Sequence, residues 1–224
     1  MRIEKHWFYQ ISQSEDTILQ CLEGIHVCVF DTTSTIETIE VGEGVTLFYF
    51  TYFSQEIRIK KHFKLLWENS KVRIFAFNYS TQNQLHYSLT GEVCASNTFL
   101  DMKITSIVGE AGNINADGIV QINEDLKGVE WYLKQENIFL WNTGKIRGIP
   151  TLLVRSNDVK ASHGCNIEKI SDEKLFYLRS RGLEKDVAIR VMIESYVRNI
   201  FVHLENIDKE FYDELIEKIV GGIE

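Results

Sequence analysis

The sequence contains one proline and four cysteines among 224 residues, and none of the cysteines belongs to a CxxC pair. A zinc site or a disulfide framework requires cysteines at close, recurring spacings, so neither is indicated. We expect most of the thiols to be buried, because free cysteine is among the most buried residue types; they are Cys21, Cys28, Cys94 and Cys165. Pro150 precedes TLLV and is expected at the first residue of a strand, where its missing N–H is tolerated.

Long apolar runs are also missing. No stretch approaches the roughly 20 residues that span a bilayer, and the N-terminus MRIEKHWFYQ lacks the apolar segment of a secretory signal. The formal net charge of -8 offers no concentrated basic surface of the kind that binds nucleic acid. We therefore expect a cytoplasmic protein that has neither a membrane nor a nucleic acid as its partner.

Three motifs of catalysis or nucleotide binding are absent, namely GxSxG, GxxxxGKS/T and HExxH. Each motif encodes a geometry that its chemistry requires, so the chain does not read as an NTPase, a hydrolase of those kinds or a zinc protease. Gly109, Gly112 and Gly118 lack the GxGxxG spacing and lead into strand-like sequence, which indicates corner glycines. We expect no enzymatic activity.

From residue 25 onward, short runs of β-branched and aromatic residues alternate with polar corners, as in HVCVF, VTLFYFTYF, KVRIFAFNY and QLHYSLTGEV. Their spacing of about 10 residues predicts successive strands and turns without long helical crossovers. This pattern fits a sandwich, a barrel or a stacked β-solenoid, and no copied repeat distinguishes them. Residues 1–24 are expected to form a short N-terminal segment, with a strand in IEKHWFYQI and a short helix in DTILQCL.

After residue 170 the apolar period changes from two to 3.6, which predicts three amphipathic helices. The first covers 172–181, with Ser171 as its N-cap and Gly182 as its left-handed end. The second runs from about 184 to 204, and the third from about 209 to 220. We expect their apolar stripes to pack on the sheet body or on another protein, and the helices to cap one end of that body.

His163 is the chain's principal candidate for chemistry. It lies between Ser162 and Gly164 at the predicted exit from the last strand, where an imidazole can project from a rigid edge. Cys165 follows two positions later, so a strand would point both side chains to the same face. His163 and Cys165 are thus candidate ligands for a soft metal, although two ligands do not complete a site. The alternative is a hydrogen-bonded turn histidine.

The run VKASHG, followed by LFYLRSRGL, a long helix and a final acidic helix, resembles the C-terminal part of the SufB/SufD family of iron–sulfur cluster assembly proteins. The resemblance covers roughly residues 127–224, and the Ser-His-Gly triplet is similar to SufD. It implies a mainly β protein with a right-handed parallel β-helix at residues 25–170 and a C-terminal helical domain at 171–224. The chain would be a shortened member, since usual members are considerably longer.

The resemblance also implies a function and partners. The chain would be a non-catalytic core subunit that works with the ABC-type ATPase SufC and pairs with a SufB-like subunit or a second copy of itself. His163, Ser162 and Cys165 would lie at the subunit interface where a transient, shared iron–sulfur cluster forms. The helical domain would hold the ATPase through residues of the first helix and the turn after it, namely Phe176, Tyr177, Arg179, Arg181, Gly182 and Leu183.

Departures from the family pattern keep other interpretations open. The SufB cysteine thought to hold the nascent cluster maps near Glu136 or Asn137, where this chain has no cysteine, and Ala161 replaces a cysteine common in SufD. These departures favour a supporting subunit. One alternative is a structural adaptor that binds the ATPase without cluster chemistry. The other is a sugar-active β-solenoid protein, which would need carboxylates grouped on one face.

Overall fold

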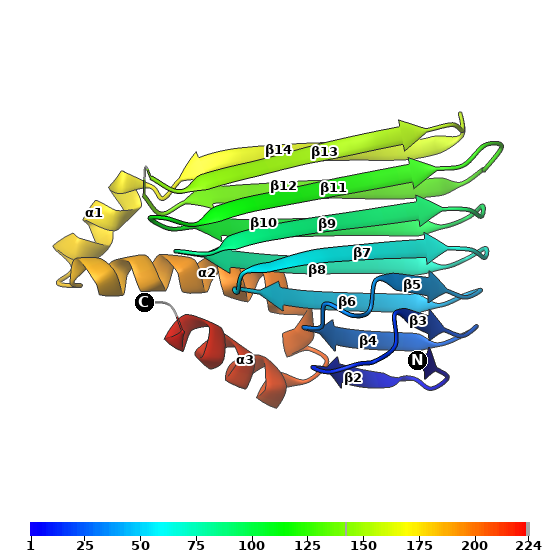
Figure 1. The fold of residues 1–224 in the computed structure, drawn as a ribbon, viewed down its shortest axis with the longest axis horizontal. Coiled ribbons are helices and arrows are strands. Elements are labelled where there is room, and N and C mark those ends of the chain that lie inside the picture. Colours follow the sequence, from blue (N-terminus) through cyan, green and yellow to red (C-terminus); the bar gives the residue numbers. More distant parts are fainter. Residues whose placement is uncertain (142, 223–224) are drawn as a thin grey trace.

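Two seven-stranded parallel sheets face each other across one core in the computed structural model, which describes residues 1–141 and 143–222 (Figure 1). The odd sheet contains, in spatial order, β1 (Arg2–Ile3), β3 (Ile18–Cys21), β5 (Thr38–Val41), β7 (Ile57–Leu65), β9 (Gln84–Val93), β11 (Asn113–Ile122) and β13 (Lys145–Val154). The even sheet contains β2 (Trp7–Ile11), β4 (His26–Asp31), β6 (Thr46–Phe53), β8 (Lys71–Ser80), β10 (Phe99–Val108), β12 (Val129–Phe139) and β14 (Val159–Lys169).

The chain alternates between the two sheets, so each strand pairs with the strand two places along the sequence. This confirms the mainly β, parallel β-solenoid implied by the family resemblance and excludes a closed barrel. Residues at alternate positions point inward, as the burial of every second residue in β9 and β11 shows. The side chains of successive turns therefore stack into a continuous interior that runs from Ile3 to Leu133.

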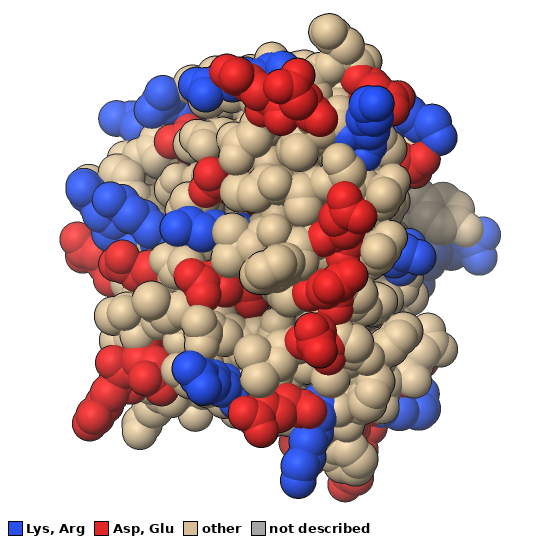
Figure 2. All heavy atoms as spheres, turned by 90° about the vertical axis from the view of Figure 1, so that its right-hand side faces the viewer, with Lys and Arg blue, Asp and Glu red and all other residues tan. Residues whose placement is uncertain are grey.

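Left-handed residues make the stacked turns that lead from the odd sheet into the even sheet. Gly24, Gly44, Asn69 and Asn97 all have positive φ, a conformation in which glycine and asparagine cost least. Gly24 N donates to Glu43 O at 2.8 Å, and Gly44 N donates to Glu68 O at 3.1 Å, so one turn lies directly on the next. Acidic and basic side chains intermingle over this end of the molecule (Figure 2).

Three helices complete the chain: α1 (Asp172–Ser180), α2 (Lys185–Glu205) and α3 (Lys209–Gly221). The predicted helices are confirmed to within about one residue; Lys174 N donates to the Ser171 hydroxyl at 3.2 Å, and Gly182 has φ +93°. The last two residues of the predicted helical domain, 223–224, lie outside the described residues. No helix among the described residues is long and apolar enough to cross a membrane.

A second hydrophobic core joins α2 and α3 to the outer face of the even sheet. Phe201 of α2 is fully buried, with its ring centroid 6.2 Å from that of Phe30 and 6.3 Å from that of Phe77. The end of β8 is consequently buried on both faces, which explains its nearly continuous run FAFNY. The apolar stripes of α2 and α3 pack on the sheet body, as expected, but they cover the outer face of the even sheet, so the prediction that the helices cap an end of the solenoid is wrong.

Two further details differ from the sequence predictions. The segment DTILQCL contains strand β3 in place of a helix, because Leu19 and Cys21 fill inward positions between β1 and β5. Pro150 lies in the middle of β13, not at its start. Lys145 N donates to Gly112 O, and Arg155 N donates to Ile122 O. Because successive residues of a strand point their amides to opposite sides, the nitrogen of Pro150 faces the free edge of the sheet. No hydrogen bond to β11 is therefore lost at the proline.

Candidate functional site at the open end of the solenoid

The end formed by β13 and β14 is uncovered, and each of these strands is the edge of its sheet (Figure 1). Inward-facing residues that would be core in any other turn are exposed here; Leu152 is 36% exposed, Val154 38% and Ile167 59%. Ile146 and Val159 already pack against the last residues of the interior core. A solenoid end with apolar side chains and unpaired backbone groups is a surface for another sheet edge.

His163 lies at the centre of β14, and not at its exit as the sequence suggested, because the strand continues to Lys169. In the parallel ladder His163 is registered with Leu133, and Cys165 with Gln135; both β12 residues are buried and inward-facing. His163 and Cys165 therefore share the inward face at the open end, and both are exposed. Ser162 points to the opposite face, in register with Tyr132.

Cys165 is positioned by two contacts. The Asn137 side-chain amide donates to Cys165 Sγ at 3.3 Å, and the thiol donates weakly to the Gly148 carbonyl at 3.7 Å across the interior. Gln135 is 1% exposed, and its Oε1 has no hydrogen-bond partner among the described residues. The residues described in a single chain contain no group of three or more histidine, cysteine or acidic ligands. His163 and Cys165 are thus two candidate ligands, fewer than the four that a tetrahedral site requires.

The thiols divide into two kinds. Cys21 and Cys28 are buried, whereas Cys94 is half-buried and Cys165 is exposed, so the prediction that most of the thiols are buried holds for only two of the four. Burial raises the pKa of Cys21 to about 12. Burial, with a smaller contribution from the Asp208 carboxylate, also raises the pKa of Cys28 to about 12. Both thiols therefore remain protonated at neutral pH, and Cys165 is the exposed thiol of the four.

Helix α1 projects from the left end of the strands in Figure 1, and none of its residues is buried. Phe176 is 75% exposed and Tyr177 57% exposed. The Arg181 guanidinium lies 5.1 Å from the centre of the Tyr177 ring. Leu175 and Leu178 pack against the second core, and Leu183 is half-buried. Arg179, Arg181 and Gly182 are exposed, so each of the predicted ATPase-binding residues is accessible apart from the half-buried Leu183.

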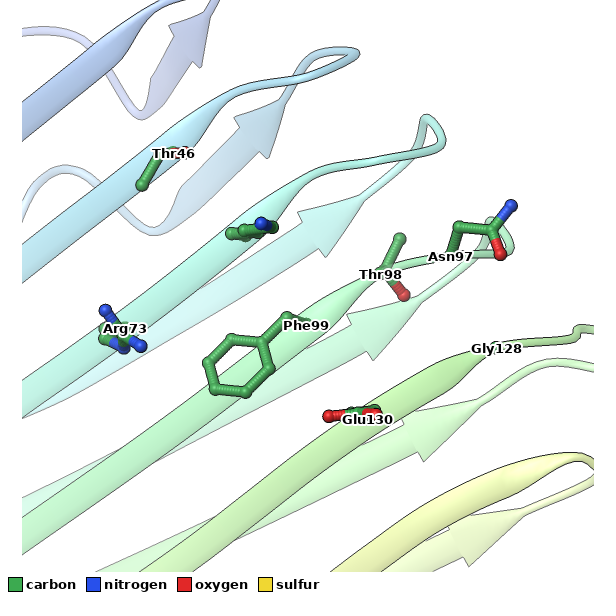
Figure 3. Close-up of a pocket in the computed structure, with 8 residues that line it drawn as sticks. Thr46, Arg73, Asn97, Thr98, Phe99, Gly128 and Glu130 are labelled. Carbon is green, nitrogen blue, oxygen red and sulfur yellow. The ribbon is translucent and has the colours of Figure 1, made fainter.

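Sequence reasoning missed a groove on the outer face of the even sheet, drawn in Figure 3. Arg73 on β8 lies between two rings, 5.5 Å from the centre of Phe48 and 5.3 Å from that of Phe99. Glu130 on β12 accepts a hydrogen bond from Lys160 at 2.6 Å. Arg73 is in register with Phe48 on β6, and Phe99 is in register with Glu130 on β12, so two adjacent outward positions of the ladder bring these residues together, which only the strand pairing reveals. Aromatic faces hold the Arg73 guanidinium and Lys160 pairs with the Glu130 carboxylate, and Lys71 is a further cation of the groove.

These features define a class: a parallel β-solenoid with an open end at β13 and β14, a histidine and a cysteine on the final strand, and three C-terminal helices, of which α1 projects from the body. A profile of the family "SUF system FeS cluster assembly, SufBD core domain" matches residues 30–196. That range covers more than half of the chain. The chain belongs to the SufBD core family.

Individual relatives agree with this assignment. The iron-sulfur cluster assembly protein SufD of Escherichia coli is 25% identical over 166 residues, which are 69% of this chain and 37% of that protein. An iron-sulfur cluster assembly SufBD family protein of Archaeoglobus fulgidus is 35% identical over 94 residues, or 42% of this chain and 25% of the relative. A SufBD family protein of Mycobacterium leprae is 29% identical over 106 residues, or 47% and 12%. The chain thus spans only a minor part of the length of these relatives.

Proposed function

We propose that the chain is a non-catalytic core subunit of a SUF-type iron–sulfur cluster assembly complex in the cytoplasm. It works with a SufC-type ABC ATPase, either as the scaffold on which the cluster forms or as a subunit that supports the scaffold. Membership of the SufBD core family supports the assembly role, and it replaces the sugar-active alternative. The observation that carries the ATPase partnership is the free helix α1, whose Phe176 is 75% exposed.

The exposed side of α1 has the composition of a docking surface. Phe176 and Tyr177 offer two aromatic side chains, and Arg179 and Arg181 flank them; aromatic residues and arginine are enriched at interface centres. A groove of about 400 Å³ separates α1 from α2, lined mainly by apolar atoms of Tyr177, Leu178 and Met192. The ATPase would bind α1 as an amphipathic helix, with the aromatic side chains as anchors.

A binding measurement with the purified ATPase tests this surface. Phe176→Ala with Arg179→Glu should weaken binding to the ATPase by about 30-fold or more, because truncating an interface anchor costs roughly 2 kcal/mol or more. Lys209→Glu, an exposed charge reversal on α3, is the matched control and should bind normally. Thermal unfolding of both variants should match the parent. Undiminished binding of the double variant would remove α1 from the interface.

The second element of the proposal is a paired core in which the open end meets another SufBD subunit. His163 then lies at a subunit boundary, where a nascent iron–sulfur cluster is held as cargo between the two chains. Nucleotide-driven closure of two ATPase copies would move the C-terminal helices of the two subunits and open this boundary. Anaerobic reconstitution with the ATPase and any SufB-like partner should give a lower cluster yield with His163→Ala than with the parent.

A structural adaptor is the second candidate function, and one observation favours it. The inward positions of β12 closest to Cys165 hold Gln135 and Asn137, with no cysteine between Trp131 and Phe139. A supporting subunit without cluster chemistry needs only the fold and the α1 surface. An unchanged cluster yield with His163→Ala, together with normal ATPase binding, would select the adaptor.

A further inference from the structure

A pocket of about 410 Å³ lies where the outer face of β2, β4 and β6 meets the connection between α2 and α3. This volume falls within the range of small-molecule sites. The described residues that line the pocket include five aromatic rings and one carboxylate, but no lysine or arginine. These six residues are His6, Trp7, Phe8, His26, Phe48 and Asp208.

The rings are held in place by contacts within the chain. His6 and His26 stack with their ring centroids 5.7 Å apart, and His26 N donates to His6 Nδ1 at 2.8 Å. The Phe8 ring packs against Phe211 of α3, with the centroids 5.0 Å apart. Trp7, by contrast, is 74% exposed. A ligand in the pocket would therefore meet rings that are already ordered and would cover part of an exposed indole.

Asp208 gives the pocket a negative charge. Its Oδ1 accepts a hydrogen bond from Phe211 N at 3.0 Å as the N-cap of α3. Among the described residues, no lysine or arginine lies within 4.0 Å of this carboxylate. The positive end of the α3 dipole amounts to only about half a charge, so the full charge of Asp208 outweighs it. The nearest cation at the lining is Arg73, which contacts Phe48 and belongs to the neighbouring groove.

We propose that this pocket binds a small organic ammonium ion, with the aromatic rings around its methyl groups and Asp208 as its counter-ion. The faces of aromatic rings attract cations, and quaternary ammonium groups are the usual ligands of such pockets. An anion would be repelled by Asp208. A small inorganic cation would find one carboxylate and no further group of acidic, histidine or cysteine ligands among the described residues.

Choline is the probe that tests the site. The chain has four tryptophans, whose indole N–H groups give separate signals in two-dimensional NMR of the full chain. Choline should shift one of these signals saturably, and Trp7→Phe should remove that signal. The neutral alcohol 3,3-dimethylbutan-1-ol has the shape of choline without its charge, so it should bind roughly tenfold more weakly. Sodium chloride at the same concentration should leave the signal in place.

Two variants separate charge from shape. Asp208→Asn removes the carboxylate and retains the cap of α3, because asparagine caps a helix as well as aspartate does. It should weaken choline binding about fivefold and leave binding of the neutral alcohol unchanged. Trp7→Ala should abolish choline binding, measured on the choline signals by saturation transfer. Trp67→Ala alters a tryptophan that is 58% exposed and lies outside the pocket, so it should bind choline normally.

Three results would overturn the inference: equal affinities for choline and the neutral alcohol, parent affinity in Asp208→Asn, or no shift of the Trp7 signal at about 50 mM choline. Thermal unfolding of each variant should match the parent, which shows that a loss of binding is local. The pocket shares no lining residue with α1 or β14. None of these results would therefore affect the ATPase and cluster measurements proposed above.

Discussion

Replacing Lys61 should test how the interior of the solenoid is held together. Lys61 is 1% exposed, and its Nζ donates to Asp31 Oδ2 at 2.6 Å, to Thr33 O at 2.8 Å and to Ile36 O at 2.7 Å. The two carbonyls belong to the connection between β4 and β5. Burial lowers the pKa of Lys61, and the Asp31 carboxylate opposes that effect. One ammonium group thus satisfies three buried acceptors.

Lys61→Met keeps the length of the side chain and removes its charge. Asp31 would retain the donors of Thr33, at 2.7 Å from both N and Oγ1, and the Tyr49 hydroxyl, but it would lose its only cationic partner among the described residues. Removing one partner of a buried pair costs about 3–5 kcal/mol. We expect the free energy of unfolding to fall by that amount in urea titrations followed by far-ultraviolet circular dichroism.

The controls separate burial from charge. Lys60→Met alters the adjacent exposed lysine and should change stability by no more than about 0.5 kcal/mol. Asp31→Asn combined with Lys61→Met removes both charges and should be less destabilised than Lys61→Met alone, because no uncompensated ion remains. A loss below about 1 kcal/mol for Lys61→Met, or equal losses for the single and double variants, would refute the reasoning.

Three further predictions concern the second core, the buried thiols and the cap of α1. Phe201→Ala should lower the free energy of unfolding by about 3–5 kcal/mol, because its ring packs against Phe30 and Phe50; equilibrium denaturation measures this. Cys28 keeps its proton to about pH 12 in the folded chain, whereas an unfolded thiol ionises from about pH 8.5. Cys28 should therefore contribute a fall in stability of about 1.4 kcal/mol per pH unit between about pH 9.5 and 11, and Cys28→Ala should remove that contribution from the slope. Ser171→Ala removes the N-cap contact to Lys174 N and should cost α1 about 1 kcal/mol, seen as faster hydrogen exchange of that amide.

The helices could be predicted from the sequence because their signals are local. Ser171 and Gly182 mark the two ends of α1 by capping chemistry alone, and the apolar spacing of α2 identifies the face that becomes buried. The surface on which that face packs could not be predicted from the sequence, because apolar periodicity does not identify the partner of an apolar stripe. The apolar residues on both faces of β8 were the one available signal that something covers the even sheet.

The strands could be predicted from the sequence, but the pairing between them could not. Alternation predicts a strand and its two faces, and it is the same in a sandwich and a solenoid, so the family resemblance selected the architecture. The position of His163 within β14 also depended on pairing, because Gly164 resembles a strand end in sequence and lies inside an 11-residue strand opposite β12. The groove at Arg73 and the buried Lys61 contacts join residues far apart in sequence, and no local pattern predicts them.

The connection between β14, at the open end of the solenoid, and helix α1 is very short. Only Ile170 and Ser171 separate β14 from α1; Ile170 is buried in the second core, and its amide continues the β12 ladder. A partner that displaces α1 would act on two neighbours. One is α2, which buries eight residues against the sheet and α3. The other is β14, which is hydrogen-bonded on one side only and has an uncovered inward face. Because β14 is held by far less buried surface than α2, a pull on α1 would move the strand that carries His163 and Cys165 before it moved α2.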